Sequence, residues 1–298
     1  MVPQGGAGVK PDARTSVVIA TRNRRLQLSA TLERLTVLDD IADIVVVDNN
    51  SADGTAAHLR QVFPDVRVVE LQSNEGAFAR TIGAHSVRTP YIAFSDDDTW
   101  WLPGSIARGA AVFDAHQRIA LLNGCVTVER NGRIDDACLA MSANRDIDDL
   151  PGCPIVFFMA GASMVRTDAF LHCGGYERRF MIGGEETLLA LDLHRCGWLV
   201  RYLPDMHVRH AACSIERDDA RRRQLLIRNR LWVAWMRYRA ASAWRATIEA
   251  ARCARRDAAA RAALLPALVG LPWAMSNREP VDVALQRRID EVWSVSAR

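Results

Sequence analysis

Phe94-Ser95-Asp96-Asp97-Asp98-Thr99 places three consecutive carboxylates at the end of an apolar segment. That segment, residues 88–94, reads RTPYIAF and is predicted to be a strand that stops near Thr99. Adjacent acids repel one another, and burying them is costly without a compensating cation. A divalent metal with oxygen ligands, Mn²⁺ or Mg²⁺, is the partner that such a site favours. A solvated acidic turn is the alternative for an isolated triplet.

Strand and helix patterns alternate upstream of these acids. Apolar strands are predicted at residues 15–20, 44–47 and 66–71, and a helical pattern follows each of them. This alternation is typical of a parallel sheet covered on both faces. We therefore predict an α/β fold with a Rossmann-like, mostly parallel sheet flanked by helices. Because ligands bind such sheets at the carboxyl ends of the strands, the turns after these strands should form one site.

Composition limits the classes of protein. The 298 residues, 49% of them hydrophobic, suit one large α/β domain with an appendage, and the net charge of +3 is too small to indicate a nucleic-acid partner. Seven cysteines without CxxC spacing indicate reduced thiols in a cytoplasmic protein. No apolar run reaches membrane-spanning length, and residues 1–13 lack the apolar core of a signal peptide.

Five motifs carry a family resemblance. A dinucleotide-binding fold would need a glycine-rich turn after the first strand, and Thr21-Arg22-Asn23-Arg24 has no glycine. Over residues 15–212 the chain instead resembles the family-2 glycosyltransferases of the GT-A fold. The matching motifs are Val17–Arg24, Val45–Thr55, Asn74–Arg80, Phe94–Asp98 and Gly183–Glu186. Two positions depart from the family pattern: Ala20-Thr21-Arg22 replaces Pro-Thr-aromatic, and Glu185-Glu186 replaces Glu-Asp.

The resemblance implies an inverting, metal-dependent glycosyltransferase that moves a sugar from a nucleoside-diphosphate sugar to a hydroxyl acceptor. It implies three metal ligands: Asp98 directly, with Asp96 and His210. The alternatives are a helix cap or turn former for Asp48, a surface ion pair for Arg80 and a structural role for His210. The implied contacts to the nucleotide sugar are Thr21, Arg22, Asp48, Asn50, Arg80, Asp96 and Asp97.

The acid pair Glu185-Glu186 follows two glycines at a predicted helix start. By resemblance Glu186 is the general base that takes the proton from the acceptor hydroxyl, and Glu185 is the second candidate. Capping of the helix, with favourable interaction with its dipole, explains the pair without catalysis.

The chain is expected to have three parts, because its composition changes at both ends of the segment that carries the resemblance. Residues 1–14 are expected to be a flexible tail, and residues 214–298 a helical region. Residues 15–213 are expected to be the catalytic domain, with a nucleotide-binding half over about 15–104 and an acceptor half over about 105–213.

The helical region interleaves arginine and tryptophan between Arg221 and Trp244. This pattern fits a helix on an anionic membrane surface, at the inner face of the cell membrane. Packing on the catalytic domain or in a homodimer is the alternative. With a lipid-linked glycan as acceptor, the protein would act in bacterial surface glycan or glycolipid synthesis.

Two other functions compete with glycosyl transfer. A sugar nucleotidyltransferase would need a glycine-rich triphosphate loop near the amino terminus, which residues 21–25 do not provide. An inactive sugar-nucleotide-binding relative would not need Asp96, Asp98 and Glu186 together.

Overall fold

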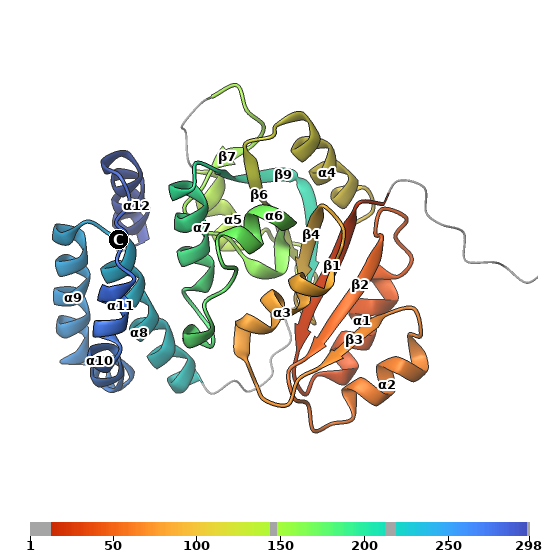
Figure 1. The fold of residues 1–298 in the computed structure, drawn as a ribbon, viewed down its shortest axis with the longest axis horizontal. Helices are drawn as coiled ribbons and strands as arrows, with labels where there is room; N and C mark the ends of the chain where they lie inside the picture. The colour runs from red at the N-terminus through yellow and green to blue at the C-terminus, as the bar shows by residue number, and fades with distance from the viewer. Residues whose placement is uncertain (1–12, 144–147, 212–218, 297–298) are drawn as a thin grey trace, which may run out of the picture.

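The computed structural model describes residues 13–143, 148–211 and 219–296. Figure 1 shows a sheet with helices on both faces and a group of carboxyl-terminal helices beside it. The strands are β1 (Thr15–Thr21), β2 (Asp43–Asp48), β3 (Arg67–Glu70), β4 (Tyr91–Ser95), β5 (Thr99–Trp101), β6 (Ile119–Val128), β7 (Cys153–Pro154), β8 (Ser163–Arg166) and β9 (Leu199–His210). Their order in the sheet is β3-β2-β1-β4-β8-β6-β9-β5, and β7 pairs with β9.

Among the described residues, seven α-helices precede residue 212 and five follow residue 218. The first group is α1 (Arg25–Leu35), α2 (Thr55–Val62), α3 (Ala79–Ser86), α4 (Ser105–Ala115), α5 (Asp136–Ser142), α6 (Thr167–His172) and α7 (Glu185–Arg195). The second is α8 (Asp219–Arg237), α9 (Ala240–Ala254), α10 (Ala258–Val269), α11 (Leu271–Ser276) and α12 (Val283–Ser296). Short 3₁₀ turns lie at Gly76–Phe78, Ala160–Ala162 and Arg178–Phe180.

The amino-terminal half has the predicted alternation of strand and helix. Strands β1 and β2 are apolar and almost wholly buried, because α1 and α2 lie on one side of the sheet and α3 on the other (Figure 1). The strands β1 to β4 run parallel, and their register pairs Thr21 with Asp48 and Ile19 with Ser95. Their carboxyl ends therefore meet at one edge of the sheet, as the sequence predicts.

The second half makes the sheet mixed. Strand β8 runs antiparallel to both β4 and β6, whereas β6 and β9 are parallel. After the acid triplet the chain enters the short strand β5, which pairs antiparallel with β9 and aligns Thr99 with His210. This long-range pairing places His210 beside the acids. The α/β class is confirmed, with the parallel strands concentrated in the amino-terminal half.

The helices α8 to α12 share a second apolar core with α7. Trp232 lies inside it, 6% exposed, with its indole N–H donating to the Ala267 carbonyl at 2.9 Å. Arg237 of α8 also pairs with Asp192 of α7, with a 3.1 Å contact between Nη2 and Oδ2. The expectation that the Arg/Trp segment lies on a membrane surface is thus wrong for Trp232, which packs within the chain. Trp244 remains 58% exposed.

Some sequence predictions fall outside the described residues. These are most of the tail, the boundary between residues 213 and 214, and Cys213. The described cysteines are free thiols: Cys125, Cys138, Cys153, Cys173, Cys196 and Cys253. Across residues 13–143, 148–211 and 219–296, no helix is long and apolar enough to cross a bilayer.

Candidate functional site

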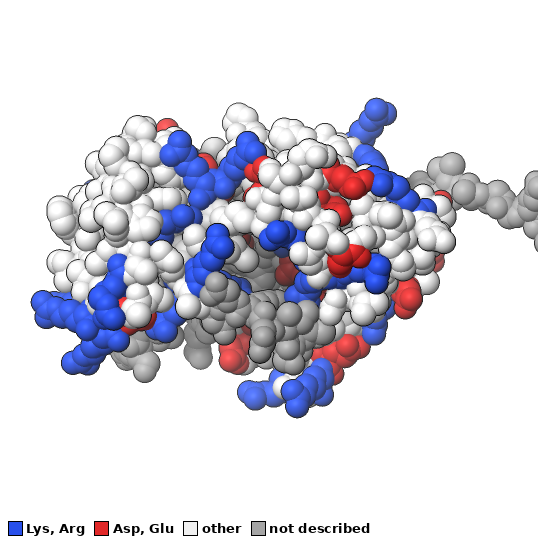
Figure 2. Space-filling view, turned by 90° about the horizontal axis from the view of Figure 1, so that it is seen from below, with Lys and Arg blue, Asp and Glu red and all other residues white. Residues whose placement is uncertain are grey.

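A cleft of about 1070 Å³ opens at the carboxyl edge of the parallel strands. Figure 2 shows the molecule from this side, with Arg side chains next to Asp and Glu side chains near the middle of the view. The cleft brings together nine of the eleven predicted site residues. They are Thr21, Arg22, Arg80, Asp96, Asp97, Asp98, Glu185, Glu186 and His210.

Asp48 and Asn50 are the two predicted residues that do not line this cleft. Asp48 is 3% exposed, and its Oδ1 accepts a hydrogen bond from the Ser51 amide at 3.0 Å. Asn50 is exposed and has a left-handed backbone, with φ of 61°. Asp48 therefore shapes the turn after β2, the alternative that the sequence left open. Its contact with a nucleotide base stays a prediction.

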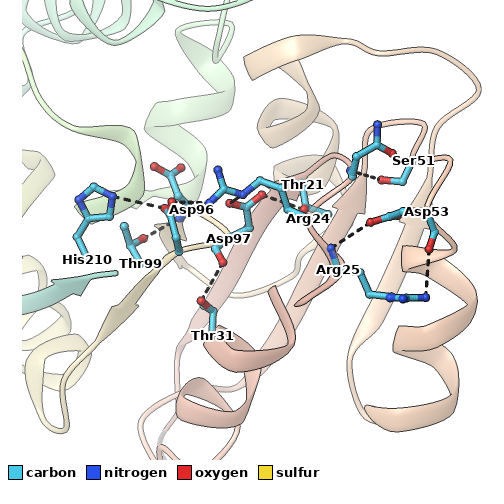
Figure 3. Close-up of polar contacts among 12 residues, drawn as sticks. Thr21, Arg24, Arg25, Thr31, Ser51, Asp53, Asp96, Asp97, Thr99 and His210 are labelled. Atoms are coloured by element: carbon cyan, nitrogen blue, oxygen red, sulfur yellow. Dashed lines mark hydrogen bonds and ion pairs between the residues drawn. The ribbon is translucent and has the colours of Figure 1, made fainter. Parts of the chain in front are cut away.

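Asp97 anchors the opening turn of the chain to the acid triplet (Figure 3). Its Oδ2 accepts a hydrogen bond from Thr21 Oγ1 at 3.0 Å, and its Oδ1 lies 2.9 Å from Arg24 Nε. Burial raises the pKa of Asp97 to about 7, although Arg24 opposes the shift. Arg24 belongs to the opening motif, which indicates no role for it; the fold shows that it contacts both Asp97 and Asp98.

Asp96 and Asp98 lie on either side of this anchor. Asp96 pairs with Arg80, and its carboxyl side chain is 40% exposed toward the cleft. Asp98 is buried; its Oδ2 lies 2.7 Å from Arg24 Nη2, and its Oδ1 lies 3.7 Å from His210 Nε2. Two arginines thus pair with the three acids, Arg24 with Asp97 and Asp98 and Arg80 with Asp96.

The donor groups at this edge fit a hard divalent cation. Asp96, Asp98 and His210 border the same cleft, and carboxylate oxygens suit Mg²⁺ and Mn²⁺. Within the part of the chain that is described, no three acidic, histidine or cysteine side chains converge to hold an ion by themselves. Mg²⁺ commonly takes one or two carboxylates, with substrate phosphates and waters completing its coordination. The residues present therefore suit a metal that is shared with a diphosphate.

The acid pair opens α7 on the other side of a glycine turn. Gly183 and Gly184 have φ of 85° and 89°, a left-handed backbone conformation that residues other than glycine rarely adopt. Glu185 is 3% exposed, and its Oε2 has no hydrogen-bond partner among the described residues. Burial and the neighbouring Glu186 raise its pKa to about 8. Burial also raises the pKa of Glu186, although the charges of Arg80 and Arg222 oppose the rise.

The helix α8 holds the turn that carries this acid pair. The buried Asn229 directs its amide nitrogen at three carbonyl oxygens, those of Phe180 at 2.9 Å, Ile182 at 3.1 Å and Gly183 at 2.5 Å. Arg228 Nη2 donates to the Phe180 carbonyl at 3.0 Å. Sequence reasoning missed Asn229. Its signal was one uncharged polar residue, between Arg228 and Arg230, in the otherwise apolar segment from Leu225 to Trp235.

The comparison of sequences identifies one family. Residues 16–174 match the family described as Glycosyl transferase family 2. A curated relative from Mycobacterium tuberculosis, an N-acetylglucosaminyl-diphospho-decaprenol L-rhamnosyltransferase, is 26% identical over 212 residues. The alignment covers 59% of this chain and 69% of the relative.

Solved structures share the fold. The mannosyltransferase PcManGT from Pyrobaculum calidifontis, in complex with GDP-Man and Mn²⁺, superposes with a TM-score of 0.58 and 17% identity. That alignment covers 89% of this chain and 73% of the other. GalNAc-T7 with UDP, GalNAc and Mn²⁺ gives a TM-score of 0.61 and 15% identity, covering 94% of this chain and 54% of that one.

Proposed function

The chain belongs to glycosyl transferase family 2 and is a glycosyltransferase, and we propose that it transfers a sugar from a nucleoside-diphosphate donor to a hydroxyl acceptor with inversion and with a divalent metal. The observation that carries this proposal is the single cleft that contains both Asp96–Asp98 and Glu185–Glu186. One group of acids suits a metal shared with the donor, and the other suits proton removal from an acceptor.

The donor would lie over the carboxyl ends of β1 and β4. Asp98, Asp96 and His210 would hold Mn²⁺ or Mg²⁺, and the exposed Arg22 lies at the rim of the same cleft. When bound, such a cation supplies positive charge that stabilises a departing diphosphate. Arg24 and Arg80 would keep the acids in place, because each already pairs with a carboxylate of the triplet.

The acceptor hydroxyl would lie beside the acid pair. Inversion requires a base on the acceptor side of the sugar. A carboxylate with a raised pKa is a stronger base, and therefore suits this role better than an ordinary carboxylate. Glu186 is the base that we favour, because it lines the cleft and remains half-buried while Glu185 is almost fully enclosed. Glu185 would then act mainly on the conformation of the turn.

The acceptor is proposed to be a lipid-linked glycan, used at the cytoplasmic face of the membrane for surface glycan or glycolipid synthesis. The mycobacterial relative, an N-acetylglucosaminyl-diphospho-decaprenol L-rhamnosyltransferase, supports this class. Leu265, Leu268 and Val269, between 62% and 74% exposed, share one face of α10. Figure 2 shows arginine side chains gathered over the carboxyl-terminal helices. Apolar and basic residues together favour an anionic membrane surface.

A hydrolysis screen of nucleotide sugars, with and without Mn²⁺, tests this proposal. UDP-, GDP- and dTDP-linked sugars would be incubated with the full chain, and release of the nucleoside diphosphate would be measured. We expect release from one donor class, and loss of that activity with a chelator. Consumption of a nucleoside triphosphate and a sugar phosphate instead would identify a nucleotidyltransferase and contradict the proposal.

A further inference from the structure

The first turns of α8 present a basic and then an apolar surface to the cleft. Arg221, Arg222, Leu225 and Leu226 line it, and their spacing of three to four residues places them on one face of the helix. Leu226 lies directly on the turn before the acid pair, since a Cβ added to Gly183 would be 2.2 Å from Leu226 Cδ2. This face of α8 therefore adjoins the side of the cleft that we assign to the acceptor.

The three consecutive arginines at the start of α8, residues 221–223, do not all face the cleft. Arg222 acts on the acid pair, because its positive charge opposes the rise in the pKa of Glu186. Arg223, the next residue, points elsewhere: it pairs with Asp257, the amino-terminal cap of α10, at 2.6 Å and does not line the cleft. Two of the three consecutive arginines thus face the site.

The acid triplet has arginine partners from other parts of the fold. Arg24 and Arg80 already pair with Asp98 and Asp96. A guanidinium group is well suited to phosphate, because its planar donors can make two parallel hydrogen bonds to one phosphate group. Arg221 and Arg222 line the same cleft as Glu186 and therefore suit an anionic group on the acceptor.

We propose that Arg221 and Arg222 bind the diphosphate of an amphiphilic, lipid-linked acceptor, and that Leu225 and Leu226 contact the start of its hydrocarbon chain. The inference rests on the proposed function, because Glu186 fixes where the acceptor hydroxyl lies. The ligand that fits has a hydroxyl-bearing sugar, a diphosphate and an apolar chain in that order. Glu186, the two arginines and the two leucines all line the one cleft.

Calorimetry with farnesyl diphosphate tests this subsite. The full chain is first saturated with Mn²⁺ and the nucleoside diphosphate that binds it, so that the donor site is filled, and farnesyl diphosphate is then titrated. We expect wild type to bind it, and the double variant Arg221→Ala/Arg222→Ala to bind about tenfold more weakly or worse. Arg223→Ala is the matched control and should bind as wild type does. Inorganic pyrophosphate should bind less tightly than farnesyl diphosphate and show the same loss.

The possible outcomes of this experiment distinguish binding of an acceptor diphosphate from binding of the donor nucleotide. Equal affinity of wild type and double variant for farnesyl diphosphate would overturn the subsite. Loss of nucleoside diphosphate binding alone would overturn it too, because the arginines would then serve the donor. Normal nucleotide binding by wild type without any farnesyl diphosphate binding rejects the subsite but leaves the transferase proposal intact. If no nucleoside diphosphate binds wild type, the proposed function itself fails. Should the double variant fold poorly, Arg222→Gln must still show weakened binding.

Discussion

Replacing Asn229 with alanine should loosen the turn that carries Glu185 and Glu186. The Asn229 side chain is fully buried and is within 3.1 Å of three backbone carbonyl oxygens of that turn. Alanine removes this side-chain donor, and the three buried carbonyls then lose the hydrogen bonds that Asn229 donates to them. Since a buried polar group left unsatisfied costs about 1–3 kcal/mol, we expect the free energy of unfolding to fall by roughly 2–3 kcal/mol.

Gln224→Ala is the matched control for this variant. Gln224 is also a side-chain amide on α8, but it is at the surface and donates to a single carbonyl, that of Ala262 at 3.0 Å. Its loss should cost about 0.5 kcal/mol, as is usual for surface substitutions. Urea unfolding of both variants, followed by circular dichroism, measures the difference.

Hydrogen exchange reports on the turn itself. The Ala77 amide donates to the Met181 carbonyl at 2.7 Å, so its protection depends on the position of the turn. In Asn229→Ala this amide should exchange faster, and donor turnover should fall while nucleotide affinity stays close to wild type. If Asn229→Ala is no less stable than Gln224→Ala and Ala77 remains protected, α8 does not position the acid pair.

Three further predictions concern the acids and the carboxyl-terminal helices. Glu186→Gln should lower kcat by about a hundredfold or more with donor affinity unchanged, and Glu185→Gln should do less; normal turnover in both variants would place the base elsewhere. Burial raises the pKa of Glu185 from 4.5 to about 8, so its ionised form destabilises the fold, and stability should fall as pH rises through this interval. The free energy of unfolding, measured with urea, should therefore favour Glu185→Gln over wild type more at about pH 8.5 than at about pH 5. If the difference between the two proteins is the same at both pH values, the raised pKa is contradicted. The full chain should cosediment with anionic vesicles, less so at high salt, and Leu265→Glu should weaken this; equal binding to neutral vesicles argues against the membrane surface.

Local patterns in the sequence were enough to predict the sheet edge and most of the cleft. The apolar strands β1 and β4 end in polar turns, and parallel pairing brings those turns together whatever the rest of the chain does. The Gly183-Gly184 turn was also visible, because two glycines before two acids mark a helix start. These features depend on neighbours in the chain, which a sequence displays directly.

What the sequence could not provide depends on contacts between distant segments. His210 comes beside Asp98 only because β5 pairs antiparallel with β9. The burial of Trp232 depends on α10 packing against α8, which an alternation of arginine and tryptophan does not reveal. The same limit applies to Asn229, whose partners lie 46 to 49 residues earlier in the chain.

The central claim, that the acids after β4 hold a metal shared with the donor, is tested most directly by titrating nucleoside diphosphates into wild type and Asp98→Ala, with and without Mn²⁺. Asp205→Ala is the control, because Asp205 is a surface acid that pairs with Arg108 away from the cleft. We predict that Mn²⁺ strengthens binding to wild type and to the control, and that this metal-dependent gain disappears in Asp98→Ala while the circular dichroism spectrum is unchanged. An Asp98→Ala variant that binds the diphosphate with Mn²⁺ as tightly as wild type would contradict the account.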